Sequence, residues 1–113
     1  VDSKYTVGDP EWDEMFIRGL DAGGNLKETG FIHWNGPNLG ATNESGFTAL
    51  PGGYRNNAEG LFYSIANIGY FWSSSQTDPN TALDRRLYWD NAMIARFNSN
   101  KQFGLSVRCL LNS

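Results

Sequence analysis

The stretch ALDRRLYWDNAMIARFN, residues 82–98, decides the fold. Its first half, Ala82 to Trp89, alternates with the period of a β-strand, in which successive side chains point to opposite faces of a sheet. Asp90-Asn91 is typical of a turn, and Met93 to Asn98 is the predicted partner strand. The stretch therefore predicts an antiparallel hairpin, whose first strand divides its side chains between two faces: Leu83, Arg85 and Leu87 on one, and Asp84, Arg86 and Tyr88 on the other.

Neighbouring segments extend this hairpin into a sheet. Gly69 to Ser75 is a predicted strand rich in aromatic residues, and the polar residues Gln76 to Asn80 form the turn that follows it. Downstream, Asn98 to Lys101 turns the chain into a further predicted strand from Phe103 to Leu111. The last forty-odd residues are thus expected to form an antiparallel β-sheet.

The N-terminal half predicts one early helix and then long loops. Asp9 can accept a hydrogen bond from the first free backbone amides of a helix, and Pro10 suits its first position. Apolar residues recur at helical spacing as far as Leu20, so we expect a helix from Pro10 to Leu20, ended by the glycines of Asp21 to Gly24. From Gly30 to Arg55, frequent Gly, Asn and Pro predict structured loops. The fold class is α+β.

Size and charge exclude several classes of protein. The chain has 113 residues, the size of one domain, with nine basic and twelve acidic residues and a formal net charge of −3. It has no excess of cations to neutralise phosphates, so nucleic acid is not an expected partner. No apolar stretch approaches the ~20 residues that span a bilayer, and no signal peptide is recognisable. We expect a soluble chain, or a mature piece of a secreted protein.

The residue inventory gives no support to an enzyme or a His/Cys metal site. His33 is the single histidine and Cys109 the single cysteine. We expect His33 to be a hydrogen-bonded loop residue and Cys109 to be a buried, inert thiol, because Cys109 alternates in phase with Leu105 and Val107. No cofactor or catalytic residue is predicted. Calcium stays possible because turn residues supply hard oxygens, although their spacing fits turns better than an EF-hand loop: Asp78, Asn80, Asp84, Asp90 and Asn91.

A mixed aromatic and polar surface near the C-terminus is the predicted ligand-binding site. Aromatic rings stack on the apolar faces of sugars, and amides, carboxylates and Arg supply adaptable hydrogen bonds at recognition surfaces. The alternative, that the aromatic residues belong to the core, carries about equal weight for any single ring. The predicted binding residues are Trp72, Asp84, Arg86, Tyr88, Trp89, Asp90, Asn91, Met93, Phe97, Ser99, Gln102 and Phe103.

Long motifs along the chain resemble one known family. They are NLKETG at 25–30, HWN at 33–35, GATNESGFTALPGGYR at 40–55, FWSSS at 71–75 and GLSVRC at 104–109. These motifs are similar to those of the Fibrobacter succinogenes major paralogous domain. The resemblance implies a C-type-lectin-like fold, akin to that of the formylglycine-generating enzymes, in a secreted or cell-surface bacterial protein.

The chain also departs from that family. The family carries further N-terminal strands and a second cysteine, and the chain matches only from Tyr5-Thr6-Val7 onward. The resemblance therefore implies the C-terminal two thirds of the domain, with Cys109 separated from its usual partner. The catalytic cysteines of the formylglycine-generating enzymes have no counterpart here. The resemblance implies a binding scaffold, adhesin-like and extracellular, whose ligand is a glycan or a surface protein.

A second resemblance supplies the alternative function. The segment between FWSSS and GLSVRC is similar to the variable regions of diversity-generating retroelement proteins. There, adenine-directed mutagenesis changes surface residues on a fixed C-type-lectin-like frame. If this likeness holds, the chain recognises a protein ligand, and its adaptable surface includes several of the predicted binding residues, together with Ala95.

Overall fold

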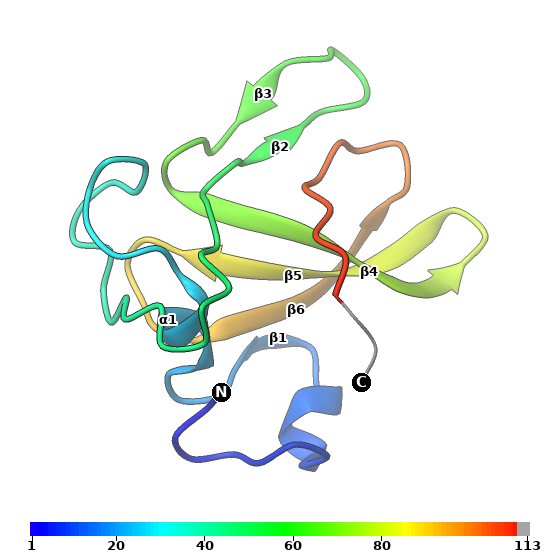
Figure 1. The fold of residues 1–113 in the computed structure, drawn as a ribbon. Coiled ribbons are helices and arrows are strands. Elements are labelled where there is room, and N and C mark those ends of the chain that lie inside the picture. The colour runs from blue at the N-terminus through cyan, green and yellow to red at the C-terminus, as the bar shows by residue number, and fades with distance from the viewer. Residues whose placement is uncertain (111–113) are drawn as a thin grey trace.

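A four-stranded antiparallel sheet forms the centre of the molecule (Figure 1). The computed structural model describes residues 1–110. The strands are β1 (Phe16–Arg18), β4 (Ile68–Asp78), β5 (Thr81–Tyr88) and β6 (Ile94–Asn100), and they lie in the order β1-β6-β5-β4. Strands β4, β5 and β6 follow one another as hairpins. The mainly antiparallel sheet predicted from the C-terminal half is confirmed.

The register of these strands confirms the predicted alternation. Asp84 on β5 lies opposite Trp72 on β4 and Phe97 on β6, and these three side chains share one face. The bounds differ slightly from the prediction because β4 continues through the expected turn to Asp78. Its Oδ1 accepts hydrogen bonds from the backbone N–H groups of Asn80, at 2.7 Å, and Thr81, at 2.9 Å. This carboxylate therefore closes a tight turn.

Four short elements surround the sheet. They are the 3₁₀ helix η1 (Pro10–Asp13), the helix α1 (Ala22–Leu26) and the small hairpin of β2 (Tyr54–Arg55) and β3 (Phe62–Tyr63). In Figure 1 the β2–β3 hairpin stands at the opposite end of the molecule from η1 and the N-terminal segment. None of the helices within residues 1–110 is long and apolar enough to cross a membrane.

The predicted helix from Pro10 to Leu20 is wrong beyond its first turn. Asp9 does cap that turn, accepting from the backbone N–H of Glu11 at 2.9 Å, and Pro10 is its first residue. The chain then leaves the helix and adopts a positive φ of 73° at Phe16. Strand β1 pairs with β6 instead, so backbone hydrogen bonds to a distant strand replace those of a longer local helix.

The glycines predicted to end a helix lie inside α1. A Cβ atom on Gly23 would stand 2.0 Å from the backbone oxygen of Met93, and one on Gly24 would stand 2.1 Å from that of Gly40. Only glycine permits these close approaches. The pair therefore lets a short helix dock directly on two other backbone segments.

The hydrophobic core lies between the sheet and the loops of residues 27–50. Trp34, Ala49 and Leu87 are its most buried members, and the Trp34 Nε1–H donates to the Ala49 carbonyl oxygen at 3.0 Å. Partly buried side chains complete the cluster: Leu26, Phe47, Phe71, Trp89 and Ile94. The long loops are structured, as predicted, because an indole at their centre both packs and forms a hydrogen bond.

The predicted strand from Phe103 to Leu111 is wrong over the residues that the structure describes. Residues 104 and 106 form only isolated bridges, Gly104 with Arg55 and Ser106 with Phe71, and Leu111 lies outside the described range. Without strand pairing the alternation does not bury one side of the segment. Cys109 is consequently exposed, which corrects the expectation of a buried thiol.

Candidate functional site

One face of the sheet brings half of the predicted binding residues together. We call it the aromatic face, and it carries the side chains of Tyr70, Trp72, Asp84, Arg86 and Phe97 in adjacent register positions. Tyr88 and Ser99 extend the same face along β5 and β6. Alternation on three neighbouring strands is sufficient to place these side chains side by side.

An ionic network lies at the centre of the aromatic face. The Nε of Arg86 lies 2.8 Å from Oδ1 of Asp84, and its Nη2 donates to Oγ of Ser99 at 3.1 Å. Ser99 in turn donates to Oδ2 of Asp84 at 2.7 Å. Burial lowers the pKa of Arg86, but the hydrogen bond and charge of Asp84 outweigh this and raise it. The guanidinium is thus fixed in one position with its charge neutralised.

Two aromatic rings hold the same guanidinium between them. The Cζ of Arg86 lies 4.9 Å from the ring centroid of Tyr70 and 4.2 Å from that of Phe97. Both distances are within the range of cation–π attraction. Burial also raises the pKa of the Tyr70 phenol, which keeps its hydroxyl protonated at neutral pH.

A small hollow of about 160 Å³ opens beside this guanidinium. Its walls come from three parts of the chain: the β2 strand, the aromatic face and the segment after β6. Tyr54 is the central ring, with its centroid 5.5 Å from Tyr63, 5.1 Å from Tyr70 and 5.8 Å from Phe103. The lining residues are Tyr54, Tyr70, Arg86, Ser99, Phe103 and Leu105. The hollow can therefore hold one flat, partly polar group.

The Fibrobacter succinogenes major domain matches residues 4–110 of the chain. The chain belongs to this family. No curated protein and no solved structure matches it. The family name states no function, and the geometry of this Fibrobacter succinogenes major domain is the basis for proposing one.

Four predicted binding residues of this Fibrobacter succinogenes major domain lie elsewhere, at the turn between β5 and β6. Trp89 is partly buried and packs against the core cluster. Asn91 accepts from the backbone N–H of Met93 through Oδ1 at 2.9 Å, so its side chain serves the turn. Asp90 is exposed there. None of these four residues is among those that line the hollow.

Two more of the predicted binding residues are buried. Asp84 is 0% exposed, which corrects its assignment to an open surface, whereas Ser99 is 8% exposed and lines the hollow. Ala95, which the retroelement likeness placed on an adaptable surface, is also 0% exposed. Alternation separates the two faces of a strand, but it does not tell which positions another segment covers.

The remaining predicted residues lie at the edges of the aromatic face. Trp72 borders a second shallow hollow with Gln76 and Lys101, away from the first. Gln102 accepts from the side chain of Asn57 at 2.9 Å, which ties the segment after β6 to the β2–β3 hairpin. The prediction that His33 is a hydrogen-bonded loop residue is confirmed, since its Nδ1 lies 2.9 Å from Oε2 of Glu28.

Sequence reasoning missed three tyrosines and one lysine. Tyr70 is two residues before Trp72 on the same strand, so the alternation already placed it on the aromatic face. Tyr54 and Tyr63 meet through the β2–β3 pairing, and no local pattern marks that contact. Lys27 is 0% exposed, and its Nζ donates to the carbonyl oxygens of Leu39, Tyr88 and Asn91 at 2.9, 2.7 and 3.1 Å.

Residues 1–110 contain no group of three or more His, Cys, Asp or Glu side chains placed to hold a metal ion. The oxygen-bearing residues of the calcium hypothesis are instead spread over two turns and the ionic network of the aromatic face. Asp78 and Asn80 lie in the turn after β4, and Asp90 and Asn91 lie in the turn after β5. Asp84 is bound by Arg86 and Ser99.

Proposed function

We propose that this domain is a ligand-binding module that recognises a glycan through the hollow beside Arg86. The observation that supports the proposal is the convergence of Tyr54, Tyr70 and Phe103 around a guanidinium whose charge is already neutralised by Asp84. Aromatic rings contribute apolar contact area, and phenol and guanidinium N–H or O–H groups can meet hydroxyls. A neutral sugar fits this combination better than an anion does.

The size of the hollow supports a single sugar ring as the buried part of the ligand. At about 160 Å³ it is smaller than the ~300–1,000 Å³ of most pockets for drug-sized molecules. The rest of a longer glycan would lie along the exposed side chains of the β2–β3 hairpin. On this proposal the domain has the C-type-lectin-like architecture that its motifs resemble and acts outside the cell, as an adhesin-like module.

A glycan array, run with and without calcium, tests the proposal. We expect binding to at least one class of neutral glycan. Isothermal titration with the best array ligand should then show about tenfold weaker binding for Phe103→Ala, as is usual for an aromatic residue central to a contact. Phe31→Ala is the matched control, because Phe31 is 68% exposed on a loop outside the hollow.

Two results would contradict the proposal. One is an array without a hit under either condition, and the other is equal loss of affinity in Phe103→Ala and Phe31→Ala. Thermal unfolding of each variant, measured beside the titration, distinguishes loss of the site from loss of the fold.

Recognition of a protein is the second candidate, because the β2–β3 hairpin beside the hollow is apolar and exposed. Leu61, Phe62 and Ile65 are 56%, 64% and 60% exposed. Clustered exposed apolar side chains are typical of protein contacts. If the chain is a retroelement-diversified receptor, its locus should contain a near-identical template repeat that differs at adenines, and a locus without that repeat would count against this reading.

A further inference from the structure

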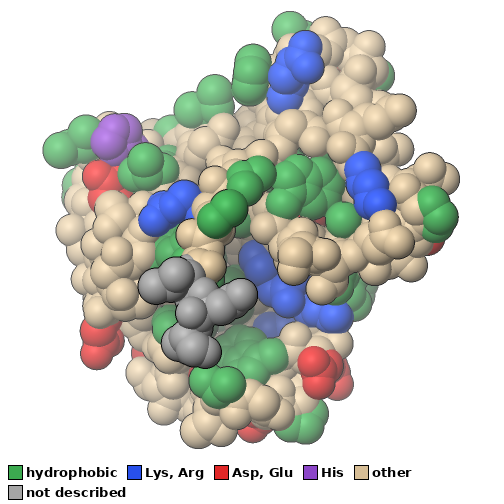
Figure 2. Space-filling view, turned by 45° about the vertical axis from the view of Figure 1, so that its right-hand side comes forward, with side chains coloured by type: hydrophobic (Ala, Val, Ile, Leu, Met, Phe, Trp, Pro, Cys, Tyr) green, Lys and Arg blue, Asp and Glu red, His purple; other side chains and the backbone are tan. Residues whose placement is uncertain are grey.

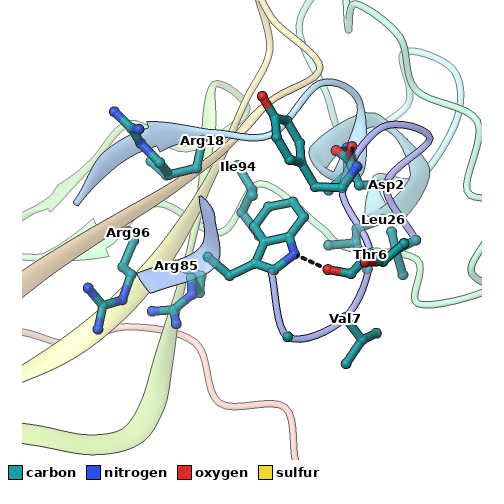
Figure 3. A pocket seen from close by; sticks show the side chains of 14 residues that line it. Asp2, Thr6, Val7, Arg18, Leu26, Arg85, Ile94 and Arg96 are labelled. Atoms are coloured by element: carbon teal, nitrogen blue, oxygen red, sulfur yellow. Dashed lines mark hydrogen bonds between the residues drawn. The ribbon is translucent and has the colours of Figure 1, made fainter. Parts of the chain in front are cut away.

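The opposite side of the sheet, which we call the cavity face, borders a cavity of about 730 Å³, larger than the hollow beside Arg86 (Figure 3). Its walls are β1, β5 and β6 on one side and the N-terminal segment with α1 on the other. Trp12 lines the cavity, and its indole N–H donates to the Thr6 carbonyl oxygen at 2.9 Å. Leu26, Ile94 and Val7 add further apolar surface.

Three arginines line one end of this cavity. Arg85 and Arg96 lie directly opposite each other on β5 and β6, and Arg18 projects from β1. Figure 2 shows basic side chains recessed between apolar ones on one face of the molecule. Like charges directly opposite each other destabilise a sheet, so the repulsion between Arg85 and Arg96 lowers the stability of the fold.

Within residues 1–110, neither Arg85 nor Arg96 forms an ion pair with a carboxylate. Among the residues that the structure describes, Arg85 donates only to the carbonyl oxygen of its neighbour Asp84, at 3.3 Å. Arg96 donates to the Asp13 carbonyl oxygen at 2.8 Å, while its buried Nε has no hydrogen-bond partner in the described part of the chain. Asp2 is the single acidic residue in the described lining, and backbone N–H groups occupy both of its oxygens.

We propose that this cavity binds a small amphipathic carboxylate. The apolar body of the ligand packs against Trp12, Leu26 and Ile94, and its carboxylate meets the guanidinium groups of Arg85 and Arg96. The cavity volume is that of ordinary small-molecule sites, and guanidinium groups bind carboxylates in a bidentate geometry. The negative charge of the ligand reduces the repulsion between the two opposed guanidinium groups.

Octanoate is the probe, and octanol and octylammonium are its uncharged and cationic controls. In ¹H–¹⁵N correlation spectra of the full chain, we expect octanoate to shift the Trp12 indole resonance in a saturable way. Octanol should bind about tenfold more weakly, because it lacks a charge-assisted hydrogen bond to arginine. Octylammonium should not bind. Equal binding of octanol, or no saturable shift with octanoate, would overturn the proposal.

Arg85→Gln is the decisive variant. It should weaken octanoate binding about tenfold while octanol binding stays unchanged. Arg55→Gln is the matched control, because Arg55 is an exposed residue of the β2–β3 hairpin. Unchanged octanoate affinity in Arg85→Gln would show that the charge of Arg85 does not contribute to binding, and the proposal would fail.

Two other occupants are outcomes of the same experiment. Sedimentation velocity that shows a dimer dependent on Arg85 would assign the cavity to a second copy of the chain. Octanoate binding that occurs only after residues 111–113 are deleted would assign the cavity to the chain's own C-terminal end. Either result would overturn the small-molecule proposal, whereas binding to the monomer of residues 1–113 supports it.

Discussion

Arg85 and Arg86 are neighbours in the sequence, yet their surroundings are opposite. Arg86 points to the aromatic face, where Asp84 lies 2.8 Å away and two rings enclose the guanidinium. Arg85 points to the cavity face, where the residue directly across the sheet is Arg96. One cation is neutralised by its own chain, and the other meets a second cation beside a large cavity.

The difference follows from the two-residue period of a strand. The residue two positions before Arg86 is Asp84, so both project from the same face and can pair. The residue two positions before Arg85 is Leu83, which supplies no charge. Two adjacent charged residues on a strand therefore need partners on opposite faces of the sheet. Within residues 1–110, a carboxylate neutralises Arg86, and no carboxylate pairs with Arg85.

The largest expected effect comes from removing the matched cation with Arg86→Gln. Asp84 is 0% exposed, so its carboxylate would stay buried with Ser99 as its remaining side-chain partner. Breaking a buried ion pair on one side costs about 3–5 kcal/mol. Urea unfolding should show that loss in the free energy of unfolding.

The double variant Asp84→Asn, Arg86→Gln is the control for this prediction. It removes both charges, so it should be more stable than Arg86→Gln alone. If the two variants unfold at the same urea concentration, the pairing of Asp84 with Arg86 is not the source of the loss.

Lys27 tests whether backbone oxygens can replace a carboxylate as partners for a buried cation. Lys27→Met would leave the carbonyls of Leu39, Tyr88 and Asn91 without their donor. Unsatisfied buried acceptors cost about 1–3 kcal/mol, and we expect a loss of about 2 kcal/mol in urea unfolding. Lys101→Met, at an exposed position, should change stability by less than about 0.5 kcal/mol. Equal effects in both variants would contradict the structural role of Lys27.

The sequence was sufficient to predict the hairpin of β5 and β6, because its alternation and turn residues are local signals. It was also sufficient to group Asp84, Arg86 and Phe97 on one face. It could not tell that Asp84 is buried, because the segments that cover the aromatic face approach from β2 and from residues after β6. Burial is set by these distant segments.

The helix error has a similar cause. Asp9 and Pro10 specify a first helical turn, and the structure has that turn. Whether the chain continues as helix depends on β6, which lies about eighty residues downstream. The sequence predicts a helix end at Gly23 and Gly24 for the same reason, because the backbone segments that require glycine there belong to Met93 and Gly40.

Asp2 lines the cavity and makes a smaller, pH-dependent contribution to the stability of the fold. Burial raises the pKa of its carboxyl, but five backbone N–H groups outweigh this and hold the pKa at about 2, below the ordinary 3.8. The folded chain therefore binds this proton less readily than the unfolded chain. The stabilisation is complete above about pH 4 and is lost as the pH falls toward 2.

Asp2→Asn should reduce the free energy of unfolding by about 1 kcal/mol at pH 7, a modest value because solvent screens this position. Between pH 4 and pH 2 the wild-type chain should lose more stability than the variant does. Parallel acid titrations of the two proteins by urea unfolding provide the measurement. Curves that stay equally far apart down to pH 2 would rule out Asp2 as the titrating group.

The smallest expected effect has the opposite sign and tests the comparison most directly. Arg85→Gln removes one of two opposed cations, so the free chain should gain about 0.5 kcal/mol of stability, whereas the same change at Arg86 destabilises it. Because the cause is repulsion between charges, the gain should shrink when urea unfolding is repeated at high salt. A loss of stability at Arg85 would mean that its stem packs against the cavity wall more favourably than its charge repels Arg96, and the contrast between the two faces would then concern packing instead of charge.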